Sequence, residues 1–300
     1  MARHVAPERS GVVRVHPRLS INQATVKHAD LATALTTSAA AGYEAIGLWR
    51  EPVAEVGFDT ACAMLADSGM RFTTYCRAGF FGQPDEARRL ANSDDNRRAI
   101  DETAALAAAG AEGSTPTLVV VAGGLPEGSR DIAGARERAR DAIGALVPHA
   151  RSAGVTLALE PLHPMYATDR CVISTLAQAL DLAAAFEPAE VAVTVDTFHI
   201  FWDPAVLNSI DRAGREGRIA TYQVCDWKTP LPHDVLLSRH YPGEGVIDFA
   251  SLTTAVEATG YNRDIEVEIF NAEVWADDTS AVLHTTARSF ERFVSPHLQS

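Results

Sequence analysis

Polar side chains close four consecutive apolar runs in the second half of the chain. The runs LALE, VTVD, YQVCD and IEVEIF are mostly apolar and carry Glu160, Asp196, Gln223 and Glu268 at or near their ends, and the last run also carries Glu266. An unpaired buried carboxylate is costly, so either a partner group neutralises Asp196 or the acid holds a metal ion. Three carboxylates and an amide gathered at one place would repel each other unless a cation lay among them. We therefore expect Asp196 to bind a divalent metal.

A regular scaffold must bring these residues together, and the chain alternates short apolar runs with Ala-rich amphipathic segments. Strict alternation of strand and helix predicts an α/β protein with a parallel sheet, and eight such units predict a single (β/α)8 TIM barrel. A doubly wound open sheet is the main alternative, but no GxGxxG motif follows the first strand. The expected strands cover residues 19–22, 45–49, 71–75, 117–121, 155–160, 191–196, 220–225 and 265–270.

The expected helices lie between these strands, and several end at glycine, as helix C-termini do. They cover residues 30–42, 58–69, 95–110, 135–154, 174–186 and 248–260. The whole chain, 1–300, is interpreted as one domain in which 1–17 form an N-terminal extension. Residues 228–246 are the least regular stretch and are expected to form a long loop over the barrel mouth. Loops of that length in compact domains are usually functional, so we expect this one to cover a bound substrate.

Composition limits the kinds of partner. A net charge of -13 without a compensating basic run argues against nucleic acid. No run approaches the ~18 apolar residues of a membrane span, so no membrane partner is expected. Four widely spaced cysteines without CxxC spacing indicate reduced thiols and a cytoplasmic location.

The chain resembles the xylose isomerase-like TIM-barrel family, in its sugar phosphate isomerase/epimerase branch. The resemblance rests on LALEPLHP, VTVDTFH, QVCDW, PGEGVIDF and IEVEIFN, and it extends from LSINQAT to the last strand. It implies one metal ion held by Glu160, Asp196, Gln223 and Glu268. In the epimerase branch both glutamates also exchange protons with the substrate, which implies that Glu160 and Glu268 are the catalytic pair.

One residue departs from the family pattern. The ligand on the seventh strand is commonly His, whereas this chain has Gln223. An amide oxygen in place of imidazole makes a shell of oxygen atoms alone, which favours Mn²⁺, or Mg²⁺ as the alternative, over Zn²⁺.

Other polar residues follow the strands closely enough to reach a substrate. The resemblance implies that His199, in the DTFH segment, contacts it. Glu266 lies one pleat deeper than Glu268 and is expected to be the buried partner of a neighbouring polar group. The further candidates for substrate binding are His163, Trp49, Arg77, Lys228 and His240.

These features predict an isomerase or epimerase that acts on a ketose or related carbohydrate through an enediolate. The sequence leaves other outcomes of the same enolate chemistry open, namely an inosose dehydratase or a 3-oxo-C-glycoside deglycosidase subunit. The alternatives from other classes are an apurinic-site endonuclease, an iron oxygenase using His163, Asp196 and His199, and a binding subunit without activity. The expected partner is a small carbohydrate, and the expected assembly is a homo-oligomer, with a hetero-oligomer as the alternative.

Overall fold

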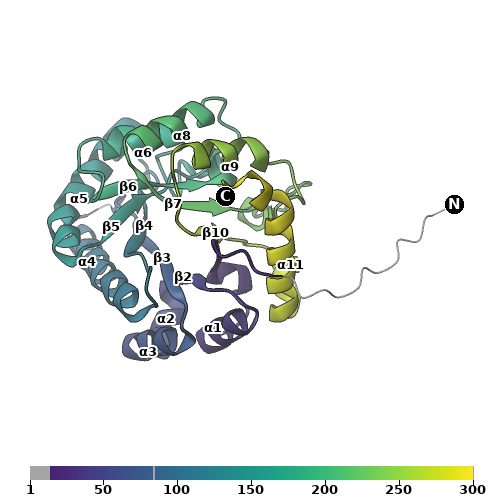
Figure 1. Ribbon diagram of the computed structural model, residues 1–300. Helices are drawn as coiled ribbons and strands as arrows, with labels where there is room; N and C mark the ends of the chain where they lie inside the picture. The colour runs from purple at the N-terminus through teal and green to yellow at the C-terminus, as the bar shows by residue number, and fades with distance from the viewer. Residues whose placement is uncertain (1–13, 84, 300) are drawn as a thin grey trace.

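Eight parallel strands close into a barrel in the computed structural model, which describes residues 14–83 and 85–299. Around the barrel the order is β1-β10-β7-β6-β5-β4-β3-β2, so each strand lies beside its neighbours in the chain (Figure 1). The strands are β1 (Leu19–Asn22), β2 (Ala45–Trp49), β3 (Arg71–Gly79), β4 (Thr117–Val121), β5 (Thr156–Leu159), β6 (Val191–Asp196), β7 (Ile219–Val224) and β10 (Ile265–Val267).

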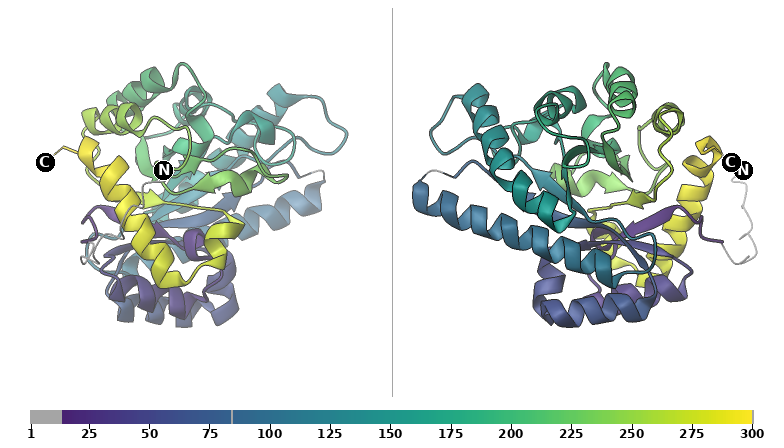
Figure 2. Two further views of the ribbon diagram at one scale, coloured as in Figure 1. Left: turned by 90° about the vertical axis from the view of Figure 1, so that its right-hand side faces the viewer. Right: turned by 60° about the vertical axis from the view of Figure 1, so that its left-hand side comes forward.

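Helices surround the barrel on the outside, and Figure 2 shows the long α4 from two further sides. Capping carboxylates start several of them: Asp30 accepts from the backbone N–H of Thr33, and Asp248 from that of Ser251. The helices are α1 (Leu31–Ala40), α2 (Arg50–Val56), α3 (Phe58–Ser68), α4 (Glu86–Ala109), α5 (Ile132–Ala153), α6 (Leu176–Ala183), α7 (Thr197–Ile200), α8 (Val206–Arg215), α9 (Phe249–Ala258), α10 (Ala272–Ala276) and α11 (Thr279–Phe293). Short 3-10 turns are η1 (Gln23–Val26), η2 (Pro164–Tyr166), η3 (Val235–Ser238) and η4 (Ser295–His297).

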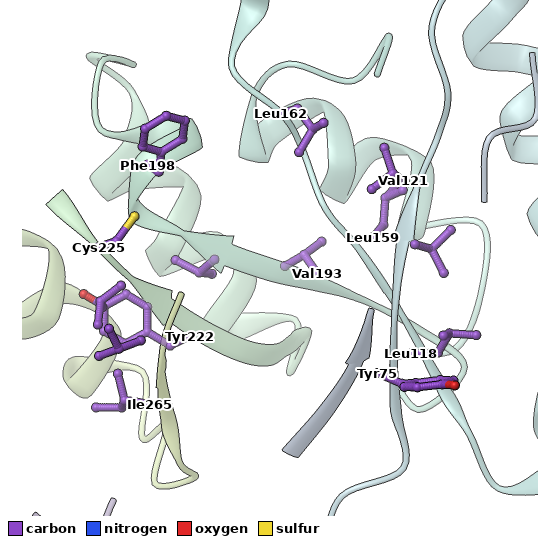
Figure 3. Packing of buried hydrophobic residues seen from close by; sticks show 14 of the residues in the cluster. Tyr75, Leu118, Val121, Leu159, Leu162, Val193, Phe198, Tyr222, Cys225 and Ile265 are labelled. Carbon is purple, nitrogen blue, oxygen red and sulfur yellow. The ribbon is translucent and has the colours of Figure 1, made fainter. Parts of the chain in front are cut away.

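Most of the core lies between the strands and the helices. Leu159, Val193 and Tyr222, from adjacent strands, are fully buried there (Figure 3). Ala158, Ala192 and Ala220 form a separate cluster of small side chains inside the barrel. Small interior residues leave room for the polar groups above them.

The predicted (β/α)8 barrel is confirmed, with differences at the ends of elements. β3 extends to Gly79 because its ladder with β4 continues that far. β10 ends at Val267, where its pairing with β1 and with β7 stops, so Glu268 follows the strand instead of lying in it. α4 begins at Glu86, earlier than expected, because Asp85 caps it by accepting from the backbone N–H of Arg88. Residues 1–13 of the expected N-terminal extension lie outside the described residues.

The expected long loop contains more structure than its sequence indicated. After β7, the short strand β8 (Asp226–Trp227) pairs antiparallel with β9 (Arg239–His240), and η3 lies between them. Asp226 fixes the base of this hairpin because its carboxylate accepts backbone N–H groups of Gly243, Gly245 and Ile247 at 2.8–3.0 Å. A side chain at position 245 would lie 2.2 Å from the carbonyl oxygen of Trp227, so glycine is required there.

Candidate active site at the barrel mouth

Four polar side chains lie at or near the C-terminal ends of their strands. Glu160 follows β5, Asp196 ends β6, Gln223 lies on β7 and Glu268 follows β10. Each is more than nine-tenths buried. Glu160 and Glu268 line a cavity of about 500 Å³ at the mouth. Among the described residues, Glu160, Asp196 and His199 also form a group whose potential metal-ligating atoms lie within 4.8 Å of one another.

A buried arginine lies among these carboxylates. Arg239, on β9, is 2% exposed; its Nη2 donates to Asp196 Oδ2 at 2.9 Å, and its Nη1 lies 3.1 Å from Glu268 Oε2. The ring of Phe198 packs against the guanidinium, with 4.5 Å between its centre and Cζ. Arg239 is therefore a partner that neutralises Asp196, so the burial of Asp196 does not by itself require a metal.

Burial and mutual repulsion alter the acidity of the two glutamates. The pKa of Glu160 is raised well above its usual value by burial and by the charges of Asp196 and Glu268. Burial also raises the pKa of Glu268 to about 8, although Arg239 opposes the shift. Both carboxyl groups can consequently hold a proton near neutral pH, as general acids and bases must.

His199 presents a donor to the same space. Its Nδ1 accepts the backbone N–H of His163 at 3.1 Å, which assigns the proton of the neutral imidazole to Nε2. Burial, followed by the charge of Arg239, holds the pKa of His199 well below its usual value, so the ring is neutral. Nε2 lies 3.0 Å from Nη2 of Arg239, so two donors face each other. An oxygen atom placed to accept from both would relieve this contact.

Glu266 lies deeper in the barrel and has a structural role, as expected. It is fully buried and accepts hydrogen bonds from Asn22, Thr73, Thr74 and Gln223 at 2.6–3.0 Å. The bond from Gln223 Nε2, at 2.7 Å, fixes the orientation of that amide. The Oε1 of Gln223 is buried and has no hydrogen-bond partner in the described part of the chain.

Trp49 and Arg77 line the cavity, as expected of substrate-binding residues. The guanidinium of Arg77 lies over the rings of Trp49 and Phe80, with 5.6 and 4.7 Å from Cζ to the ring centres. This stacking holds the charge of Arg77 at the cavity wall.

Three other predicted substrate contacts, His163, Lys228 and His240, are not among the described residues that line the cavity. The imidazole of His163 packs instead against Trp202 and Trp227. Nζ of Lys228 lies 3.1 Å from Nε2 of His240. Successive side chains of a strand point to opposite faces, so the inward direction of Arg239 turns His240 away. The geometry gives these three predictions no support.

Some residues that line the cavity are not evident from the sequence. Arg239 immediately precedes the HYPGEGVID segment, and period-two alternation makes it and His240 alternatives for the inward position. Gln23, Tyr166 and Trp275 also line the cavity. Gln23 and Trp275 carry no distinctive spacing in the sequence, so only the closed barrel reveals them.

The residues present fit a divalent metal ion. Glu160, Asp196 and Glu268 carry three negative charges when ionised, and Arg239 supplies one positive charge, so a divalent cation would balance the cluster. Gln223 lies opposite Asp196 on the neighbouring strand, and its unpartnered Oε1 is a further oxygen atom that could ligate a metal. Hard oxygen donors of this kind suit Mn²⁺ or Mg²⁺.

Comparison with known proteins agrees with this architecture. The model of the xylose isomerase-like TIM barrel matches residues 35–286. The chain belongs to this family. The crystal structure of a protein from Sinorhizobium meliloti 1021 superposes with a TM-score of 0.87 at 42% identity, covering 92% of this chain and 98% of that one. The structure of the IolI protein with a bound zinc atom superposes with a TM-score of 0.80 at 21% identity over 94% and 100% of the two chains, which shows the fold alone.

Curated relatives of this family member include an isomerase and an epimerase. An inosose isomerase of Bacillus velezensis is 27% identical over 146 residues, which are 48% of this chain and 50% of that one. An L-ribulose 3-epimerase of Mesorhizobium japonicum is 26% identical over 167 residues, 50% and 51% of the two chains. The chain thus spans about half the length of the curated relatives it matches. In the part of the chain that the structure describes, no helix has the length and apolar character needed to cross a membrane.

Proposed function

We propose that this protein is a divalent-metal-dependent isomerase or epimerase that acts on a ketose or related carbohydrate through an enediolate. The main support is the convergence of Glu160, Asp196 and Glu268 in one buried cluster beside a cavity of about 500 Å³. The isomerase and epimerase among the curated relatives support the same class of reaction.

Glu160, Asp196, Gln223 and Glu268 would hold the ion, which we expect to be Mn²⁺, with Mg²⁺ as the alternative. When bound, the ion supplies Lewis-acid stabilisation of negative charge on the substrate.

Proton transfer is assigned to Glu160 and Glu268. One carboxylate removes the proton next to the substrate carbonyl, and the other, protonated, returns a proton. Return to the same carbon from the opposite face gives an epimer, and return to the neighbouring carbon gives an isomer. Nε2–H of His199 and the guanidinium of Arg239 converge where they can donate to a substrate oxygen.

The test is proton exchange in D₂O. The protein is incubated with Mn²⁺ and a panel of ketoses, inososes and 3-oxo-glycosides, and deuterium at the carbon next to the carbonyl is followed by NMR. Exchange with formation of an epimer or isomer supports the proposal, and elimination or glycoside cleavage would assign the lyase alternative instead. Glu273→Gln is the matched control for Glu268→Gln in this assay, because the Glu273 carboxylate is 80% exposed and lies outside the lining of the cavity. Absence of exchange with every member of the panel contradicts the proposal.

Location and assembly remain predictions. We propose a cytoplasmic protein that forms a homo-oligomer, with a hetero-oligomer as the alternative. Light scattering of the purified protein measures the assembly, and a monomer would contradict this prediction.

A further inference from the structure

Gln23 carries an unused donor group and lies in the wall of the cavity. It directly follows β1, is 1% exposed and lines the cavity. Its Oε1 accepts the backbone N–H of Trp49 at 3.1 Å, which fixes the orientation of the amide because an NH₂ group cannot accept that bond. Its Nε2 is buried and has no partner in the part of the chain that the structure describes. An unmade hydrogen bond of a buried donor is costly, so a group outside the fold is expected to supply it.

Tyr166 presents a second unused group on another wall. It lies in η2 after β5, is 7% exposed, and its hydroxyl has no hydrogen-bond partner among the described residues. The ring is held edge-on against His199, with 6.0 Å between the ring centres, and Arg170 lies over its face. The phenol is therefore positioned by packing, its oxygen is buried without a partner among the described residues, and the residue lies in the lining of the cavity.

The closed barrel places these two groups on opposite walls. β1 and β5 lie four steps apart in either direction around the barrel, so they are diametrically opposed. The carboxylates Glu160, Asp196 and Glu268 come from the strand ends of β5, β6 and β10 and lie along the arc from β5 to β1. Trp49, Phe270 and Trp275 add aromatic faces to the lining, and aromatic faces suit the C–H surfaces of a sugar.

We propose that Gln23 Nε2 and Tyr166 Oη bind two oxygen atoms at opposite ends of the substrate and thereby determine which polyhydroxylated compound the cavity accepts. This inference rests on the proposed function and deepens it. The substrate class that it defines is a polyol ketone, open or cyclic, long enough to contact both walls, with an acceptor oxygen at the Gln23 end.

The melting temperature distinguishes a substrate-binding role of these groups from a structural one. Because the Tyr166 hydroxyl has no partner within the described fold, removing it breaks no pair, whereas Gln23→Met also removes the Oε1 that accepts the backbone N–H of Trp49. Tyr166→Phe is therefore expected to keep or raise the melting temperature while it weakens substrate binding. Tyr43→Phe is the matched control, since the Tyr43 hydroxyl is buried and donates to the carbonyl oxygen of Leu283 at 2.8 Å. That variant should lose stability and keep its KM.

Steady-state kinetics on the best substrate of the panel test the inference directly. Gln23→Met, which is nearly isosteric, and Tyr166→Phe should each raise KM roughly tenfold or more with a smaller change in kcat. For each variant the rise in KM should disappear with the monodeoxy substrate analogue that lacks the oxygen bound by the replaced side chain. The missing oxygen should be at a different carbon for the two variants. Gln178→Met is the matched control for the glutamine, because the Gln178 amide accepts from the backbone N–H of Ser174 in the fold. Unchanged KM in both cavity variants, with normal turnover, would overturn the inference and leave the proposed function standing.

A binding measurement separates this inference from a failure of the proposed reaction. Trp49 and Trp275 line the cavity, so their fluorescence reports binding of the non-reacting probes sorbitol and myo-inositol without turnover. If no sugar is turned over, the proposed function fails. Weaker binding of both probes by Gln23→Met and Tyr166→Phe would still support the inference, and equal binding by the wild type and both variants would overturn it.

Discussion

Replacing Arg239 with methionine tests the electrostatic account of the site. The change keeps most of the apolar stem but removes the guanidinium that contacts Asp196 at 2.9 Å and Glu268 at 3.1 Å. Removing one partner of a buried ion pair typically costs about 3–5 kcal/mol, because the other charge stays buried and uncompensated. We expect a loss of that size in the free energy of unfolding of the metal-free protein.

Manganese should reverse part of this loss. At saturating Mn²⁺ the deficit falls by RT times the logarithm of the ratio of the two dissociation constants, about 1.4 kcal/mol for each tenfold difference in affinity. The ion should bind the variant more tightly than the wild type, because the carboxylates have lost their competing cation. We expect a Kd at least ~tenfold lower in the variant, so the deficit of Arg239→Met should fall by about 1.4 kcal/mol or more when Mn²⁺ is saturating.

Urea unfolding, followed by tryptophan fluorescence in EDTA and in Mn²⁺, measures both values. Arg218→Met is the control, since Arg218 is also buried but bonds the carbonyl oxygens of Val191 and Phe186 at the other end of the barrel. Its deficit should be equal in EDTA and in Mn²⁺. An equal deficit for Arg239→Met in the two conditions would refute the idea that the ion and the guanidinium share the same carboxylates.

Four further predictions concern the proposed metal shell and its carboxyl groups. Glu268→Gln should lower kcat by ~10² to 10⁴ because it removes a general base, and normal turnover would remove Glu268 from the mechanism. Gln223→His should shift the relative affinity from Mn²⁺ toward Zn²⁺ because imidazole is a softer donor than an amide oxygen; titrations of both proteins that give the same ratio would place Gln223 outside the shell. The affinity for Mn²⁺ should rise with pH, since the ion must displace protons from Glu160, whose pKa is raised, and from Glu268, whose pKa is about 8. Carboxyl groups with a raised pKa bind more protons in the folded than in the unfolded state. The metal-free protein should therefore lose stability as the pH rises from ~4.3, the pKa of an unfolded Glu, toward 8. A stability profile without slope in this pH range would contradict the raised pKa values.

The barrel and its acidic cluster were predictable from the sequence because both depend on local patterns. Eight apolar runs in alternation with amphipathic helices define the sheet, and the same period places Asp196 and Gln223 at the ends of their strands. The deeper position of Glu266 also follows from period-two alternation. Its bonds to Asn22, Thr73 and Thr74 do not, because β1, β3 and β10 become neighbours across the interior only when the barrel closes.

Other features were decided by tertiary structure alone. Sequence pattern could not choose between Arg239 and His240 as the inward residue, because the direction of a two-residue strand is set by its pairing with Asp226 and Trp227. Nor could it join Gln23 and Tyr166, which are separated by half of the (β/α) units of the chain and come to line one cavity only when the barrel closes. Periodicity assigns residues to faces of single elements, whereas the partners of a buried charge or an unused donor are fixed by how distant elements close around one cavity.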